Sequence, residues 1–128
     1  MAVWRQKAIV AFPMLRLDIQ APDYSYYMLF FDLLPIVRTA HREDDCIILV
    51  DIYIFTAWCL RQRRAGDLYN AVCVAFYEHL FDERDLWEDV IPWLTPQVVQ
   101  TCWPLWEVRL SAEEQINLRR RLDQVIVK

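Results

Sequence analysis

The sequence predicts an all-α fold: a compact single helical domain over residues 1–128, with about six helices, several of them kinked or divided by proline. Residues that favour helix N-caps recur along the chain, and the apolar residues between them follow helical spacing. Gly66 is the only glycine, which excludes tight β-hairpins and glycine-rich phosphate loops, because both need several positions with positive φ. A chain of 128 residues buries about two-thirds of its unfolded surface, so one core is expected.

The first two helices are delimited by proline and by one N-cap. A short helix is expected over residues 3–12, and Pro13 ends it because proline cannot continue an α-helix. Asp23 can cap a second helix over residues 24–39, which has a broad apolar face of tyrosine, phenylalanine and leucine side chains. Pro35 is expected to kink or divide this second helix.

A third helix is expected over residues 46–64, with Asp44 or Asp45 as its N-cap. Its beginning, CIILVDIYIF, is rich in β-branched and aromatic residues, so residues 46–54 could form either a helix or a strand. Helix is favoured because the pattern continues without a breaker as far as the arginines before Gly66, beyond the length of a typical strand.

The central helix is expected over residues 68–81, with Asp67 as its cap. One face of this helix collects side chains at helical spacing, namely Leu68, Ala71, Val72, Ala75, Phe76 and His79. A further helix around residues 85–93 contains Pro92, which cuts it.

The last two helices have the clearest start signals. Thr95 followed by Pro96 is an N-cap with proline at the first helical position, and Pro104 is expected to interrupt that helix. Ser111 and Glu114 form a capping box, in which each side chain accepts a hydrogen bond from the backbone N–H of the other residue. The apolar stripe of the last helix consists of Leu118, Leu122 and Val125.

The acidic residues concentrate in one segment, residues 78–89. The chain has a net charge of −4, and this segment alone contributes −5, from six acids against Arg84. Large aromatic side chains ringed by charge are typical of protein-binding surfaces, because the aromatics desolvate well and the charges steer a basic partner. The predicted partner-binding residues are Asp82, Glu83, Asp85, Trp87, Glu88, Asp89 and Trp93. The same charges also suit a solvated junction between two helices, and that alternative stays open.

We expect no catalytic residue, no metal and no cofactor. The two histidines, His41 and His79, lie far apart, and Ser25 and Ser111 are the only serines, so neither histidine has an evident nucleophile to activate. The acids lack the alternating oxygen ligands and the glycine of a calcium loop. The four cysteines have apolar neighbours and form no CxxC pair, which predicts buried thiols.

Composition also limits the partners and the compartment. The net negative charge argues against nucleic acid as a partner. The longest uncharged stretch, residues 90–106, contains three prolines, so no membrane-spanning helix is expected. The N-terminal apolar stretch is interrupted by Pro13 and lacks a small-residue cleavage site, which predicts a cytoplasmic protein.

Two motifs, NAVCVAFYEHL and DVIPWLTPQVV, resemble parts of the small all-helical domains of bacterial immunity proteins, which neutralise toxins. The match covers about a third of the chain. In this resemblance Glu78 is the carboxylate of the first motif, and Thr95 stands where the second motif usually has a glycine before proline. The resemblance implies a protein partner, a basic toxin domain whose active site the acidic segment would cover.

Two other functions stay open. Six residues each of Trp, Tyr and Phe also suit a self-assembling structural or adaptor protein, a homo-oligomer such as a homodimer with a symmetric interface. An enzyme would require Glu78, His79 and Asp82 to converge in a pocket.

Overall fold

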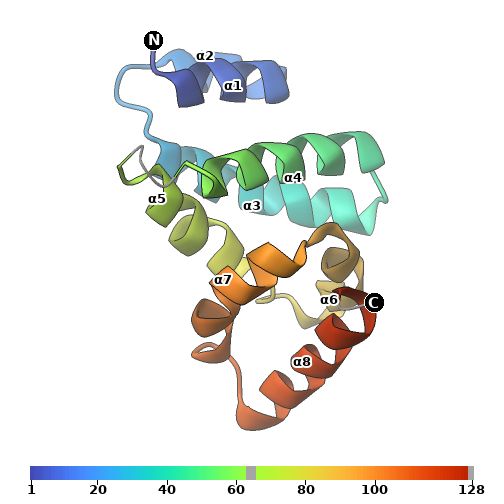
Figure 1. Ribbon diagram of the computed structural model, residues 1–128. Helices are drawn as coiled ribbons and strands as arrows, with labels where there is room; N and C mark the ends of the chain where they lie inside the picture. Colours follow the sequence, from blue (N-terminus) through green and yellow to red (C-terminus); the bar gives the residue numbers. More distant parts are fainter. Residues whose placement is uncertain (63–65, 127–128) are drawn as a thin grey trace.

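The computed structural model describes residues 1–62 and 66–126, and over those residues it is all-α, as predicted. This part of the chain contains eight α-helices and four short 3-10 helices and no strand (Figure 1). The elements are α1 (Val3–Ala11), η1 (Pro13–Leu15), α2 (Arg16–Gln20), α3 (Tyr26–Arg42), α4 (Cys46–Leu60), α5 (Leu68–Ala75), η2 (Tyr77–His79), η3 (Arg84–Leu86), α6 (Trp87–Val90), η4 (Ile91–Trp93), α7 (Pro96–Glu107) and α8 (Ala112–Ile126).

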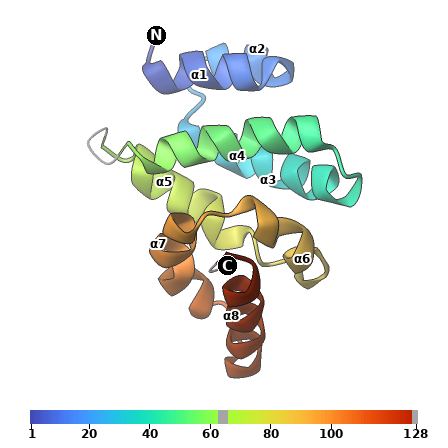
Figure 2. The same ribbon diagram turned by 45° about the vertical axis from the view of Figure 1, so that its right-hand side comes forward.

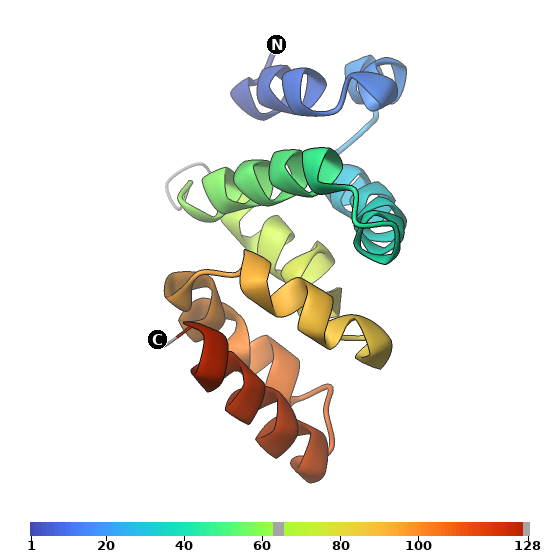
Figure 3. The same ribbon diagram turned by 90° about the vertical axis from the view of Figure 1, so that its right-hand side faces the viewer.

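The helices are stacked in nearly the order of the sequence. Figures 1 and 3 show α1 and α2 as one layer, the antiparallel pair α3 and α4 as the next, and α8 at the end farthest from α1. Helix α5 crosses beneath α3 and α4, contacts both, and continues toward α7 (Figure 2). Because each layer contacts the next, the core is one continuous cluster of buried side chains from Ala8 to Leu122.

Helix α3 differs from the prediction at its start and at Pro35. Its N-cap is Ser25, whose Oγ accepts a hydrogen bond from the N–H of Met28, and not Asp23. Pro35 does not divide the helix, which continues to Arg42. Proline lies on the exposed side of the helix, where water can reach the carbonyl that lacks an N–H partner.

Helix α4 settles the choice between helix and strand for residues 46–54 in favour of helix. Asp45 caps it, with its Oδ1 accepting a hydrogen bond from the N–H of Ile48 at 3.3 Å. The helix ends at Leu60, and the rest of the predicted continuation, residues 63–65, lies outside the described residues.

The predicted helix over 68–81 breaks at Phe76, where the backbone turns to φ −122° and ψ −70°. Two indoles donate hydrogen bonds to carbonyls that follow the break, one of which, that of Tyr77, also accepts from the N–H of Leu80. The Nε1 of Trp106 donates to the carbonyl of Tyr77 at 2.6 Å, and the Nε1 of Trp87 donates to the carbonyl of Phe81 at 2.8 Å. The bond from Trp106 spans 29 residues and is not encoded by local sequence, and both bonds stabilise the irregular backbone inside the core.

The start signals of the last two helices are confirmed. The Oγ1 of Thr95 accepts a hydrogen bond from the N–H of Val98, and Ser111 and Glu114 form both bonds of the capping box. Pro104 does not interrupt α7, which continues to Glu107. Leu118 and Leu122 are buried as expected, whereas the side chain of Val125 lies outside the described residues.

Asp67 precedes α5 as predicted but forms no capping hydrogen bond with its side chain. The expected helix around residues 85–93 is instead three short pieces, η3, α6 and η4, which follow one another without a gap. Three of the four cysteines are buried, but Cys46 is exposed, because it is the first residue of α4 and lies at the helix end.

Candidate functional site

The acidic residues of the predicted site gather on one side of η3, α6 and η4. Asp85, Glu88 and Asp89 are exposed, with Asp85 about one helical turn before the other two, while Leu86, Trp87 and Val90 face the core. Glu83 precedes this segment and is half-buried. We call the four carboxylates Glu83, Asp85, Glu88 and Asp89 the acidic surface.

Arginines from distant elements lie at the edges of the acidic surface. Arg42 of α3 reaches Glu83 at 3.8 Å and Asp85 at 3.5 Å, and Arg121 of α8 reaches Glu88 at 3.7 Å. These distances exceed those of short charge-assisted hydrogen bonds, and the side chain of Glu88 is 80% exposed. Exposed pairs of this kind contribute little to stability, so a basic partner can replace the arginines at small cost.

Asp82 lies outside the acidic surface, in a tight internal network. Both of its carboxylate oxygens accept hydrogen bonds from Arg109, at 2.9 and 2.8 Å, and Nδ1 of His79 lies 3.0 Å from Oδ2. Partial burial by itself would raise the pKa of Asp82, but the hydrogen bonds from Arg109 and His79 outweigh it and lower that pKa. Asp82 is therefore a structural anion that joins η2 to the end of α7.

Glu78 and His79 belong to the same network, so the three residues of the enzyme hypothesis do converge. Nε2 of His79 lies 3.6 Å from Glu78, and Arg109 lies 3.8 Å from the same carboxylate. The cluster holds no serine or cysteine, because Ser25 and Ser111 are helix caps in other elements. None of the described grooves is lined by these three residues.

The two tryptophans of the predicted site occupy different environments. Trp87 is only 4% exposed and packs edge-on against Phe81, so it supports the acidic surface from inside and offers a partner little surface. Trp93 is half-buried and stacks on Tyr53, with ring centroids 5.4 Å apart and an angle of 15° between the planes. Trp93 is thus the tryptophan of the pair that reaches solvent beside Asp89.

A buried polar pair lies behind Trp93. Nε2 of His41 and the hydroxyl of Tyr53 are 2.7 Å apart, and both residues are buried. Burial lowers the pKa of His41, although the charges of Asp89 and Asp44 act in the opposite direction. The pair fixes Tyr53 and, through stacking, the position of Trp93.

A second surface, on α1 and α4, was not predicted from the sequence. Three apolar side chains there are largely exposed: Val10 at 83%, Ile47 at 79% and Ile54 at 64%. In α4 the exposed residues Ile47, Val50 and Ile54 follow helical spacing toward the half-buried Trp58. The sequence feature that indicates this surface is the lack of a polar face in α4. A helix that is apolar all round is expected to be covered on every side, by the rest of the fold or by a partner.

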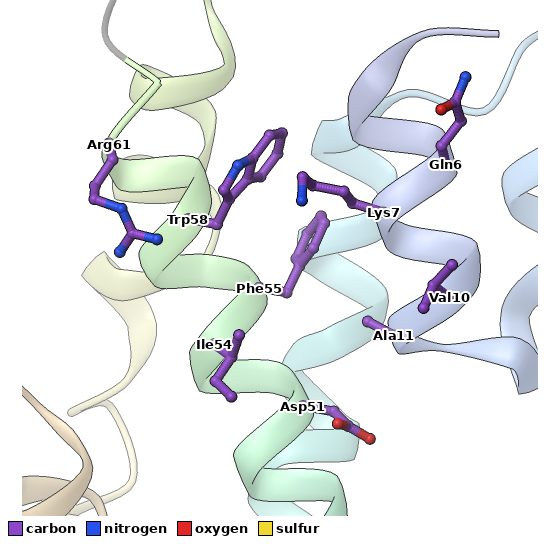
Figure 4. Close-up of a pocket in the computed structure, with 9 residues that line it drawn as sticks. All are labelled: Gln6, Lys7, Val10, Ala11, Asp51, Ile54, Phe55, Trp58 and Arg61. Atoms are coloured by element: carbon purple, nitrogen blue, oxygen red, sulfur yellow. The ribbon is translucent and has the colours of Figure 1, made fainter.

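A groove of about 580 Å³ lies between α1 and α4 on this surface (Figure 4). Ala11, Val10, Ile54, Phe55 and Trp58 form its apolar lining. Its polar lining consists of Gln6, Lys7, Asp51 and Arg61. The ammonium of Lys7 lies 5.0 Å from the ring centroid of Trp58, a cation–π contact that orients the indole. We call the exposed residues of α4 together with this groove the α1–α4 face.

Residues 1–62 and 66–126 contain neither a metal-binding cluster nor a membrane-spanning helix. No cluster of three or more histidine, cysteine, aspartate or glutamate side chains there is arranged to hold a metal ion. In the same part of the chain, no helix combines the length and the apolar character that crossing a bilayer requires.

Comparison with known proteins gives a family. Neither a curated protein nor a solved structure matches the chain. One family model, described as Domain of unknown function (DUF7674), matches residues 5–107, from α1 to the last residue of α7. The match includes both the acidic surface and the α1–α4 face and leaves out α8. The protein therefore belongs to the DUF7674 family.

Proposed function

We propose that this domain is a non-enzymatic protein-binding domain that acts in the cytoplasm as a bacterial immunity protein. Its partner in this proposal is a basic toxin domain, which it neutralises by covering the toxin's active site. The observation that carries the proposal is the acidic surface: four carboxylates near a solvent-reaching tryptophan, of which Glu83, Asp85 and Glu88 have an arginine at 3.5–3.8 Å and Asp89 has none among the described residues.

The charges support a basic partner. Asp89 forms no ion pair within the described residues, and Asp85 and Glu88 have only one exposed arginine neighbour each. A partner with several lysines or arginines would add contacts to these carboxylates without breaking the Asp82 network. Such charges accelerate association and discriminate against acidic partners.

The aromatic groups support a defined orientation. Trp93 is held by Tyr53, and Tyr53 is held by His41, so the indole is fixed before binding. A fixed aromatic side chain loses little conformational entropy when it is covered, which favours its use as an anchor. In this proposal Trp93 is the anchor, and Trp87 holds the backbone that presents the carboxylates.

The resemblance of NAVCVAFYEHL and DVIPWLTPQVV to immunity proteins supports the toxin as the kind of partner. Residues of the second motif form the end of α6, η4 and the start of α7, so it includes Asp89 and Trp93. The motif and the acidic surface therefore point to the same part of the molecule.

The test compares the wild type with two variants, each of which neutralises four acidic residues, so that the two variants have the same net charge. The binding variant carries Glu83→Gln, Asp85→Asn, Glu88→Gln and Asp89→Asn. The control variant carries four matched changes at exposed acids elsewhere, Asp18→Asn, Asp23→Asn, Glu43→Gln and Glu113→Gln. All three proteins are used to capture partners from a lysate of the native host, and bound proteins are identified by mass spectrometry.

The proposal predicts that the wild type and the control variant retain the same basic protein and that the binding variant loses it. Expression of that captured protein alone should arrest growth of the host, and co-expression of the wild type should restore it. Equal capture by all three proteins would overturn the acidic surface as the site. A captured protein that is harmless when expressed would overturn the immunity role.

A further inference from the structure

The α1–α4 face has opposite charges at its two ends. Asp51 lies in the N-terminal half of α4, whereas Arg61 lies at its C-terminal end, and Lys7 of α1 lies beside Trp58 (Figure 4). Neither Asp51 nor Arg61 forms an ion pair with another described residue. A face that is acidic at one end and basic at the other is complementary to a copy of itself turned end to end.

The spacing along α4 fits such a copy in one register. In two antiparallel helices related by a two-fold axis, residues at equal distances on either side of the axis lie opposite each other. Asp51 and Arg61 are centred on the same position of α4 as Ile54 and Trp58. One register therefore pairs Asp51 with Arg61 and Ile54 with Trp58. By symmetry, each of these two pairs occurs twice in the interface.

The small residue Ala57 lies near the centre of this register and is only half-buried. A small side chain at a helix crossing allows the two backbones to approach. The groove beside α4 offers further room, because about 580 Å³ between α1 and α4 can receive the larger side chains of the other helix.

We propose that two copies of this chain associate through the α1–α4 face, with their α4 helices antiparallel. Asp51 of each copy then lies opposite Arg61 of the other copy. Within one helix, Asp51 and Arg61 are about 15 Å apart along the axis, so the two ion pairs lie at opposite ends of the interface. Ile54 of each copy packs against Trp58 of the other. The part of the apolar stripe formed by Ile54 and Trp58 is thereby covered, as expected for a helix without a polar face.

This dimer leaves the acidic surface open. None of the residues that line the groove belongs to η3, α6 or η4. Two copies would present two acidic surfaces, one on each. Self-association and capture of a basic partner can therefore be tested separately, and either can fail without the other.

The first experiment measures the mass of the purified protein by light scattering during size-exclusion chromatography. The wild type is expected to elute as a dimer. Asp51→Lys and Arg61→Glu each place like charges opposite one another and are expected to weaken dimerisation about tenfold or more. A mixture of the two variants is expected to recover the dimer, because the introduced lysine then faces the introduced glutamate.

The second experiment tests the apolar part of the face. Ile54→Glu is expected to give a monomer, since it introduces a charge at the middle of the interface. Leu17→Glu is the matched control, because Leu17 of α2 is also an exposed aliphatic side chain but lies outside the α1–α4 face. Helical content and melting temperature, measured by circular dichroism, show that each variant is folded.

Three results would overturn the proposal. A wild type that remains monomeric at all concentrations would show that the face is used by another protein or by none. A dimer that survives Ile54→Glu would place the interface elsewhere. A mixture of Asp51→Lys and Arg61→Glu that stays monomeric would exclude the antiparallel register.

Discussion

At the scale of single residues, buried tryptophans act as hydrogen-bond donors to an irregular backbone. Trp106 is 1% exposed, and its Nε1 donates to the carbonyl of Tyr77, while its ring packs edge-on against Phe81 with centroids 4.7 Å apart. The carbonyl of Tyr77 also accepts from the N–H of Leu80 at 3.1 Å, so the indole supplies its second hydrogen bond. A typical hydrogen bond contributes about 0.5–1.5 kcal/mol, which adds to the contribution of the buried ring.

We predict that Trp106→Phe lowers the free energy of unfolding by about 2–4 kcal/mol, because it removes the donor and leaves a cavity. Chemical denaturation followed by circular dichroism measures this loss. Trp103→Phe is the control, since Trp103 is partly exposed and donates no hydrogen bond among the described residues. If the two substitutions cost the same, the hydrogen bond to Tyr77 does not hold the break after α5.

A pH dependence follows from the lowered pKa of Asp82. A carboxyl group whose pKa is lower in the folded state stabilises the fold above its unfolded pKa of about 3.9, and loses that effect as the pH falls through its folded value. We predict that Asp82→Asn costs about 1 kcal/mol at pH 7 and progressively less below about pH 4. Denaturation of both proteins at several pH values checks this.

Asp123→Asn serves as the control for this series. Asp123 pairs with Arg119 at 3.7 Å on the exposed side of α8, so its loss should cost less than about 0.5 kcal/mol at every pH. A cost of Asp82→Asn that did not change between pH 7 and pH 3 would show that shape, and not charge, holds the Arg109 contact.

At the scale of elements, Arg5 fastens the N-terminal layer to the rest of the fold. Its guanidinium donates to the carbonyls of Ala21 at 3.0 Å and Tyr24 at 2.6 Å, and also to that of Ile19. These carbonyls lie in and beyond the end of α2, where a helix supplies few backbone donors, and among them that of Ala21 also accepts from the N–H of Tyr24 at 3.1 Å. One side chain of α1 thus closes the turn that leads into α3.

We predict that Arg5→Met loosens α1 and α2 and leaves α3, α4 and α5 nearly unchanged. Hydrogen exchange should show faster exchange of amides in residues 3–20, with a loss of local stability of about 2 kcal/mol. Arg16→Met is the control, because Arg16 is exposed on α2 and has no ion pair among the described residues. Uniform acceleration over the whole chain would contradict a local role for Arg5.

The elements that could be predicted from sequence are those whose signals are local. Ser111 with Glu114, Thr95 with Pro96, and Asp45 mark helix starts within four residues, and the structure confirms all three. The break at Phe76 could not be predicted, because Trp87 and Trp106 stabilise it from other parts of the chain.

The prolines show the same limit. Pro35 was expected to kink or divide its helix and Pro104 to interrupt its own, but both helices continue through the prolines. Buried side chains before and after each proline, such as Leu34 and Val37 in α3, pack in one core and keep the helix together. Tertiary packing outweighs the lost hydrogen bond, and a local rule contains no measure of that packing.

At the scale of the whole molecule, the sequence predicted which segment is acidic, but not which residues of that segment share one exposed surface. Asp82 and Glu83 are neighbours in the sequence, yet Asp82 forms two hydrogen bonds with Arg109, whereas Glu83 has only a longer contact with Arg42, at 3.8 Å. Those arginines are 27 and 41 positions away, so neither pairing is visible in the sequence. The exposed face of α4 was missed because its residues were read only as core.

Two surfaces with different chemistry result from this arrangement. The acidic surface on η3 and α6 offers exchangeable charges beside Trp93, and the α1–α4 face offers apolar side chains between charges of opposite sign. Charged surfaces confer salt-dependent association, whereas apolar interfaces depend less on salt. Binding of a basic partner should therefore weaken with salt far more than self-association does.

The most direct measurement is the affinity of the captured partner for the wild type, for the four-carboxamide binding variant and for its matched control, each at low and high salt. The expected result is that the binding variant weakens affinity at least about tenfold at low salt and loses most of the salt dependence, while the control variant retains both. Equal affinities and equal salt dependence for all three proteins would contradict a binding function of Glu83, Asp85, Glu88 and Asp89.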